Sequence, residues 1–326
     1  MTTTASATLL DAAPAGSPLP APLSAAQAID AWESCKRGVS ALLREEQPDA
    51  AWLARLEEGL AQARSLAARD PDAALYLLMQ TAATDVDRYS GSHVLLCAVI
   101  CELCAHWFDW PTHEIDALLR AALTMNVSMS ATQDALARQS GPLSDLQRIE
   151  IDQHAERSAA MLASAGVSDE LWLDVVRQHH AEPSIESVAS TPALRLAELL
   201  HRVDVYTAKL SRRVSRDPVS PALAARDACL NAQGTPDAIG VTLLRVIGLY
   251  PPGSFVLLRS GEVGVVVKRG AKAHTPMVAL LRRADGGLYS PPVPRDTASH
   301  KQAVLRGVRL AEVKVRVNHE RALACA

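Results

Sequence analysis

Five side chains in this sequence are of the types that bind metal ions, and they lie at expected helix ends or in apolar helical stretches: His93, His154, His179, His180 and Asp204. Neutral imidazoles and carboxylates are the usual ligands of Zn, Fe, Mn and Ni. Asp204 lies in an apolar stretch, where an acid is costly unless it is paired or binds a metal. Spacing alone does not link the five residues, and on spacing alone ordinary hydrogen-bonded or surface histidines are the better interpretation.

A second group of candidate ligands consists of Cys97, Cys101 and Cys104, with His106 nearby. The three cysteines recur at i, i+4 and i+7, so one helix face can present all of them. A metal or redox site is one interpretation. Small apolar residues on a buried helix stripe are the interpretation that we favour.

The elements that position these residues are expected to be helices. Apolar residues make up 48% of the 326 residues and aromatic residues only 4%, with Ala and Leu dominant, which favours helices over a β-sandwich. After Tyr250, short β-branched runs replace the helical periodicity and predict strands. The sequence therefore predicts a mainly α fold with a small β-rich C-terminal appendage. The helices are expected near residues 25–46, 49–69, 71–79, 93–107, 112–123, 144–165, 168–180, 191–213, 221–232 and 237–248, and the strands at 255–258, 263–268 and 277–282.

The same patterns divide the chain into four parts. We expect a disordered tail at residues 1–22, an N-terminal helical segment at 23–71, a helical domain at 72–249 and a β-rich region at 250–326. The tail lacks the layout of a secretory signal and no apolar run reaches membrane-spanning length, so a cytoplasmic location without membrane contact is expected.

Charge is unevenly distributed along the chain. Residues 195–326 carry a net charge of +11 and the remainder carries −14. The basic part either meets an anionic ligand or acidic partner, or packs on the acidic part of its own chain, and charge asymmetry does not choose between these.

Several motifs, in their order and spacing, resemble the HD-GYP family of bacterial proteins. The resemblance covers about residues 72–270 and implies an HD-superfamily helical bundle. It also implies that His93, His154, His179, His180 and Asp204 occupy metal-ligand positions of a family that hydrolyses cyclic di-GMP at a two- or three-metal centre. The matching stretches are Asp85–Tyr89 with His93, Ala121–Leu123, Leu143–His154, His179–His180, Val203–Tyr206, and Ile247–Ser254 followed by Gly264–Val267.

The departures from the family pattern concern catalytic positions. Met125-Asn126 stands where the family has His-Asp, and Met129 stands where it has a lysine that would face the substrate phosphate. No Gly-Tyr-Pro lies in the 14 residues between His180 and Arg195, and Ala181 follows the histidine pair in place of Glu. The family's aspartate bridges two metals, whereas an asparagine is neutral and a thioether is a soft, poor ligand for these ions. Without that bridge, the activation of a shared hydroxide and the clamping of the phosphate are lost.

The resemblance implies two fates for the metal positions. His154, His179 and His180 survive as the ligands of one metal, so this position either holds one divalent transition metal (Fe, Mn or Zn) or is a relic held by hydrogen bonds. His93 and Asp204 belong to the other metal and have lost two partners. We expect no metal there and no catalytic residue at Met125, Asn126 or Met129.

Three functions follow as hypotheses. The first is a catalytically impaired regulatory or binding module in cyclic-di-GMP-type signalling, with a signalling protein as partner. The second is an active metal-dependent phosphodiesterase or phosphohydrolase in which Glu182, Glu150 or Asp152 replaces the lost carboxylate. The third is a sensor that binds a cyclic dinucleotide without cleaving it, using the basic residues of one helix, and none of the three involves nucleic acid. Those basic residues are Arg195, Arg202, Lys209, Arg212 and Arg213. The oligomeric state does not follow from the sequence.

Overall fold

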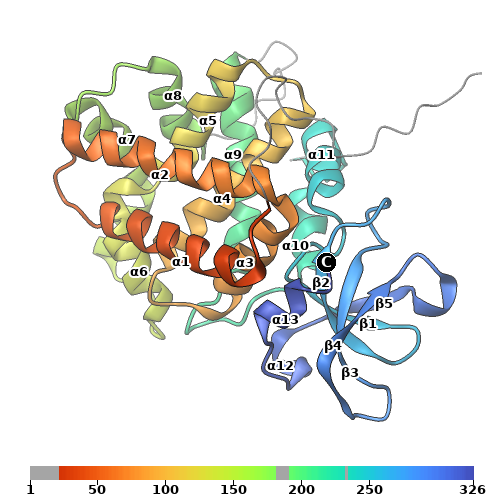
Figure 1. Ribbon diagram of the computed structural model, residues 1–326. Helices are drawn as coiled ribbons and strands as arrows, with labels where there is room; N and C mark the ends of the chain where they lie inside the picture. Colours follow the sequence, from red (N-terminus) through yellow and green to blue (C-terminus); the bar gives the residue numbers. More distant parts are fainter. Residues whose placement is uncertain (1–21, 181–190, 232–233) are drawn as a thin grey trace, which may run out of the picture.

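The computed structural model describes residues 22–180, 191–231 and 234–326. A helical body is followed by a five-stranded antiparallel sheet near the C-terminus (Figure 1). This confirms the predicted mainly α fold with a small β-rich appendage. Apart from Pro22, the predicted disordered tail lies outside the described residues, as does Glu182.

The helices that start at Ala25, Pro71 and Asp145 begin directly after capping residues, whereas the helix that starts at Tyr89 begins four residues before its predicted start and has no side-chain cap. Ser24 and Ser144 each form a capping box with a glutamine three residues later, and Asp70 caps the helix that starts at Pro71. The helices are α1 (Ala25–Leu42), α2 (Ala50–Arg69), α3 (Pro71–Thr84), α4 (Tyr89–Trp107), α5 (Thr112–Thr124), η1 (Val127–Met129), α6 (Ser130–Arg138), α7 (Asp145–Ser164), α8 (Glu170–Gln178), α9 (Pro192–Leu210), α10 (Pro221–Ala228), α11 (Ala238–Ile247), η3 (His300–Gln302), α12 (Leu310–Val313) and α13 (His319–Leu323).

Helix α4 runs through the centre of the body and is buried on almost every side. Within the described chain it is the one helix with the length and apolar composition of a membrane span, and 78% of its apolar window is buried inside the protein. The prediction that no apolar run reaches that length is therefore wrong for α4. A helix that is apolar all round is also what the centre of a large helical core requires.

The C-terminal sheet has the strand order β4-β3-β2-β1-β5. The three predicted strands are confirmed, and two edge strands were missed. Strand β4 contains Pro291, Pro292 and Pro294, which argue against a strand in sequence but are tolerated at an edge because that side needs no ladder donors. The strands are β1 (Phe255–Leu258), β2 (Val263–Lys268), β3 (Met277–Arg282), β4 (Leu288–Asp296) and β5 (Val304–Val308).

The sheet and the helical body share one hydrophobic core, which includes Val265 and Ala279 from the strands. Gly253 has φ +90°, and a Cβ there would lie 2.8 Å from the Cβ of Met79, so only glycine allows α3 to approach this turn. Arg269 at the end of β2 forms an ion pair of 2.6 Å with Asp72 on α3. The division of the chain at residues 71/72 and 249/250 stays a prediction.

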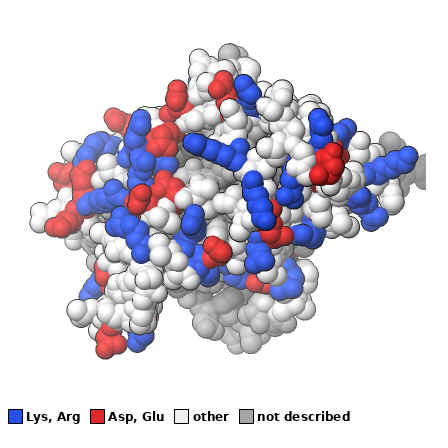
Figure 2. Space-filling model, turned by 90° about the horizontal axis from the view of Figure 1, so that it is seen from below, with Lys and Arg blue, Asp and Glu red and all other residues white. Residues whose placement is uncertain are grey.

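Part of the uneven charge is neutralised within the chain. Arg195 pairs with Glu114 and Arg269 with Asp72, which joins the basic C-terminal part to the acidic N-terminal part. On the face shown in Figure 2, basic and acidic side chains are interspersed over most of the surface. Intramolecular packing thus accounts for a share of the asymmetry.

Candidate metal centre

Helices α4, α7, α8 and α9 gather the five predicted ligands into two separate groups. We call His154, His179 and His180 the histidine triad, and His93, Cys97, Asp204 and Thr207 the His93 cluster. Within the triad, and within the set of His93, Cys97 and Asp204, each residue has a ligand atom within 4.8 Å of those of the others.

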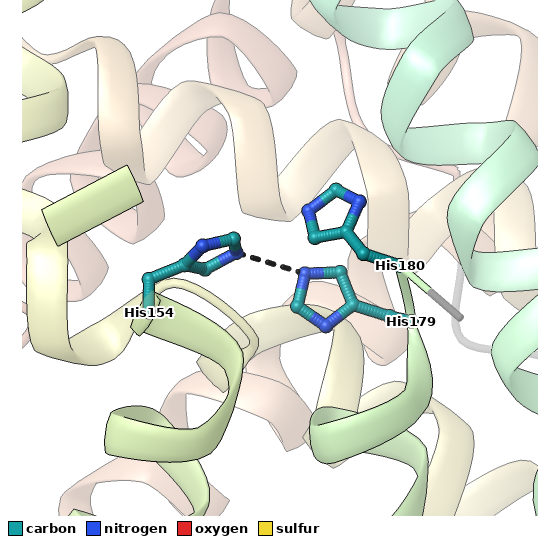
Figure 3. A group of neighbouring side chains, drawn as sticks. All are labelled: His154, His179 and His180. Atoms are coloured by element: carbon teal, nitrogen blue, oxygen red, sulfur yellow. Dashed lines mark hydrogen bonds between the residues drawn. The ribbon is translucent and has the colours of Figure 1, made fainter. Parts of the chain in front are cut away.

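The histidine triad is positioned by the packing of α7 on α8. His154 lies on the buried face of α7 with Ser158, Ala159 and Leu162. His179 and His180 follow the last turn of α8, whose apolar face is fixed partly by the indole of Trp172 donating to Thr124 Oγ1 at 2.9 Å. The three rings converge in Figure 3, one from α7 and two from the end of α8.

The hydrogen bonds of the triad determine which nitrogens carry protons. Nδ1 of His154 lies 2.5 Å from the Ile151 carbonyl oxygen, and Nδ1 of His179 lies 2.6 Å from the Val176 carbonyl oxygen. A carbonyl only accepts, so both Nδ1 atoms donate and both neutral rings present a bare Nε2 lone pair. These two Nε2 atoms lie 3.1 Å apart (Figure 3). Two facing lone pairs need a shared cation or proton between them.

The geometry is compatible with a shared metal ion. Burial is the main cause that lowers the pKa of His179 to about 3, and burial also lowers the pKa of His180, so both rings stay neutral. Two nitrogens bound to one ion at about 2.0–2.1 Å and at angles of about 90–109° lie roughly 2.8–3.4 Å apart. The observed 3.1 Å falls within that interval. Neutral imidazoles with the Nδ1–H donated to a carbonyl are also the form that metal-binding histidines take.

The His93 cluster is satisfied by its own members. Nε2 of His93 lies 2.7 Å from Asp204 Oδ1, and Nδ1 lies 3.3 Å from the Thr207 hydroxyl. Thr207 Oγ1 also lies 3.1 Å from Cys97 Sγ, and the Tyr89 ring stacks on His93 with centroids 5.6 Å apart. Both ring nitrogens of His93 thus have protein partners.

Electrostatics make His93 and Asp204 a buried ion pair. Burial acts to lower the pKa of His93, but Cys97, Tyr89 and the Asp204 carboxylate outweigh it and raise that pKa well above its usual range. For Asp204, burial acts to raise the pKa, and the bond to His93 outweighs it and holds that pKa far below its ordinary value. The contact of 2.7 Å between His93 Nε2 and Asp204 Oδ1 thus satisfies both groups without a metal ion.

Residues 125–129 connect α5 to α6 and contact α7, which carries His154. Met125 and Asn126 end α5 and are 0% and 5% exposed. Ser128, two residues after Asn126, donates a hydrogen bond from its hydroxyl to the backbone carbonyl oxygen of His154 at 3.0 Å. Met125 and Asn126 are therefore buried in the segment that leads to this contact with the backbone of His154.

Sequence reasoning missed three neighbours of these groups. The His201 ring lies 5.5 Å from that of His180, and its Nδ1 is buried without a hydrogen-bond partner in the described chain. Cys97 and Thr207 join the His93 cluster. Helical spacing is the signal that could have found them, since Cys97 is one turn after His93, and His201 and Thr207 flank Asp204 at three residues on either side.

The three cysteines predicted to share one helix face belong to the hydrophobic core. Cys97, Cys101 and Cys104 are each 0% exposed and belong to the main hydrophobic cluster. Burial raises the pKa of Cys101 and Cys104, which keeps both thiols protonated. His106 is half-exposed and lies 3.9 Å from Glu102. The favoured interpretation of these residues as small apolar core residues agrees with this packing, except that Cys97 also contacts His93.

Comparison with known proteins gives one curated relative. The chain is 28% identical over 220 residues to the cyclic di-GMP phosphodiesterase PA4108 of Pseudomonas aeruginosa, which covers 65% of this chain and 52% of the relative. The chain thus spans about half the length of the curated relative it matches. No protein-family model matches the sequence, and no solved structure matches it.

Proposed function

We propose that this protein is a signalling module related to the HD-GYP phosphodiesterases that binds in cyclic-di-GMP-type signalling without hydrolysing the nucleotide. The similarity to a cyclic di-GMP phosphodiesterase supports the signalling context. The impairment is inferred from coordination chemistry at residues 125 and 126. Its ligands are a cyclic dinucleotide, a signalling protein or both.

One observation carries the proposal: residues 125 and 126, where a second metal would have to be bridged, include no carboxylate. Met125 and Asn126 occupy the positions of the family's His-Asp, and neither side chain supplies an anionic oxygen. Of the substitutes considered from sequence, Glu150 accepts from the Thr132 hydroxyl at 2.8 Å, and Asp152 is exposed. Neither belongs to a metal-competent group among the described residues.

The histidine triad would hold a single divalent transition metal, with His154, His179 and His180 as ligands. Bound there, the metal would supply a Lewis acid that attracts a phosphate oxygen. Burial lowers the pKa of His179 and His180, and the Ile151 and Val176 carbonyls orient the rings of His154 and His179. This arrangement supports binding of a phosphate ester, whereas displacement at phosphorus needs the second ion or a base that these residues do not provide.

The hydrolysis assay tests this proposal directly. Full-length protein is incubated with cyclic di-GMP and with its linear product pGpG in the presence of Mn, Fe or Ni, beside the His154→Ala/His179→Ala double variant. We expect no turnover above the double variant and no more than one metal ion per chain by elemental analysis. Turnover that depends on the triad, or two tightly bound metals per chain, would overturn the proposal.

A gain-of-ligand variant sharpens the test. Met125→His/Asn126→Asp restores the two lost ligand types at the buried positions 125 and 126. We expect its metal content to rise to two ions per chain, because an aspartate offers the anionic bridge that Asn126 lacks. Met125→Leu/Asn126→Ser is the matched control, which changes the same buried positions without adding a ligand.

The hypothesis that a cyclic dinucleotide binds only through the basic residues of one helix is not supported by the contacts of these residues. Arg195 pairs with Glu114, Arg202 with Asp237, and Lys209 with Asp227 at 2.7 Å. The Arg213 guanidinium lies over the Tyr89 ring at 5.3 Å. Four of the five cations are thus engaged within the protein, which leaves the triad as the better place for a phosphate.

A further inference from the structure

A pocket lies at the junction of the helical body and the sheet, away from the candidate metal centre. It has a volume of about 370 Å³ and lies between the C-terminal end of α4, helix α11 and the loop at residues 269–276. That volume is at the small end of the range of roughly 300–1,000 Å³ typical of small-molecule pockets. Helix α4 connects the two sites, because Trp107 in this pocket follows His93 by 14 residues, or about 21 Å of helix.

Positive charge dominates the lining of this pocket. Arg245, Arg269 and Lys272 line it, and no lining residue that the structure describes is acidic. Arg269 is neutralised by Asp72. Arg245 and Lys272 have no ion-pair partner within the described ranges, so two unneutralised cations face one cavity. Such a concave, basic lining attracts an anion.

The remaining walls suit a flat apolar group. Trp107 is 43% exposed, which is unusual for so large an aromatic residue, and the Arg245 guanidinium lies 5.0 Å from its ring centroid. Val241, 47% exposed, and Leu244 add an aliphatic side, and Tyr250 adds a second ring. Exposed Trp beside Arg is a platform on which a planar ring can stack.

We propose that this pocket binds a small aromatic anion of the size of a nucleoside monophosphate. Its phosphate contacts Arg245 and Lys272, and its base lies against Trp107. The close approach of backbone in the loop at 269–276 supports a fixed wall on the anion side, because a Cβ at Gly270 would overlap the Thr275 carbonyl oxygen at 1.7 Å. This inference does not depend on the triad or on the fate of the HD motif.

Calorimetry with three probes tests it: GMP, guanosine, which lacks the phosphate, and inorganic phosphate, which lacks the base. We expect GMP to bind with a dissociation constant of ~1 mM or below, and at least about tenfold more tightly than either fragment. The measurement uses the full chain, and His154→Ala/His179→Ala serves as a background in which the triad is removed.

Substitutions at three exposed basic residues, two inside the pocket and one outside it, provide the test variants and their control. Arg245→Gln and Lys272→Gln should each weaken GMP binding by about tenfold. Lys301→Gln, which removes the same charge from an exposed position outside the pocket, should leave it unchanged. Binding should also quench Trp fluorescence in the parent and not in Trp107→Phe. Absence of GMP binding, or binding that survives in Arg245→Gln/Lys272→Gln or disappears in the triad-deficient background, would refute the inference.

Discussion

The histidine triad and the His93 cluster lie in the same helical body and use overlapping residue types, but their polar atoms are satisfied in opposite ways. In the triad, each Nδ1 of His154 and His179 donates to a carbonyl and the Nε2 atoms face each other at 3.1 Å. In the His93 cluster, both ring nitrogens of His93 already have partners, Asp204 at 2.7 Å and Thr207 at 3.3 Å. The triad presents free lone pairs to a ligand, whereas the cluster is complete without one.

This difference shows two ways in which a helical core can accommodate buried histidines. His93 and Asp204 form a buried ion pair in which each residue stabilises the other. The three imidazoles of the triad include no anion, and the Nδ1 atoms of His154 and His179 already donate to backbone carbonyls. Their converging geometry is therefore one that a cation could occupy.

The first prediction, with the largest expected effect, concerns the stability of the His93 cluster. Asp204→Ala should lower the free energy of unfolding by about 3–5 kcal/mol, because it leaves the buried His93 imidazolium without its counter-charge. Denaturant titration measures this. The affinity of the triad for Mn²⁺ or Zn²⁺ should fall less than in a variant that lacks a triad histidine, since Asp204 acts on His179 and His180 electrostatically and is not a member of the triad.

Asp204→Asn is the control for that variant. The amide oxygen can still accept from a neutral His93, so the loss of stability should be about half that of alanine or less. Equal losses in the two variants would mean that packing, and not the ion pair, dominates. A loss of metal binding in Asp204→Ala as large as that in a triad variant would erase the distinction between the two groups.

The second prediction concerns the metal affinity of the triad. His179→Ala should weaken binding of one divalent transition metal by at least about 100-fold, equivalent to about 2.7 kcal/mol, because one of three protein ligands is removed. Equilibrium dialysis followed by elemental analysis provides the measurement. His106→Ala, at a half-exposed histidine outside both groups, is the matched control and should bind as the parent does.

The contrast between the groups was only partly predictable from sequence. The helices that carry the five candidate residues could be predicted from apolar periodicity and capping boxes. The structure brings His154 close to His179 and His180, and His93 close to Asp204, as the family spacing suggested, whereas their role as metal ligands stays a prediction. Helical spacing places Cys97 beside His93 and Thr207 beside Asp204, but it could not show the contacts of Thr207 with His93 and Cys97, which join residues more than 100 positions apart on two helices. Nor could it show that Arg195, Arg202 and Lys209 are used in ion pairs, since the acidic partners come from three separate elements.

The third prediction tests, by removing a single hydroxyl group, whether Thr207 contributes to the hydrogen bonding of the His93 cluster. Thr207→Val removes the hydroxyl that lies 3.3 Å from His93 Nδ1 and 3.1 Å from Cys97 Sγ while keeping the β-branched shape. The free energy of unfolding should fall by about 1–2 kcal/mol, because a buried ring nitrogen loses its partner. Thermal and denaturant unfolding measure this, with Thr81→Val as a control at a hydroxyl that bonds only its own helix. An unchanged stability would show that the cluster is not closed through Thr207.

The fourth prediction, with the smallest expected effect, uses a histidine outside both groups as a baseline. His319 opens α13, and its Nδ1 lies 3.0 Å from the hydroxyl of buried Tyr76. Burial raises the pKa of Tyr76, so the phenol donates this hydrogen bond to a neutral ring. Burial also lowers the pKa of His319 below its unfolded value, so its contribution to stability is present above about pH 6.5 and is lost as the pH falls through the folded value. Between pH 7 and 5.5 the parent should therefore lose more stability than His319→Gln, and the difference should stay below about 1 kcal/mol because His319 is only half-buried. If the parent instead lost less stability than His319→Gln, protonated His319 would be stabilised in the folded state. His319 could then no longer serve as an example of a buried neutral histidine with which the triad is compared.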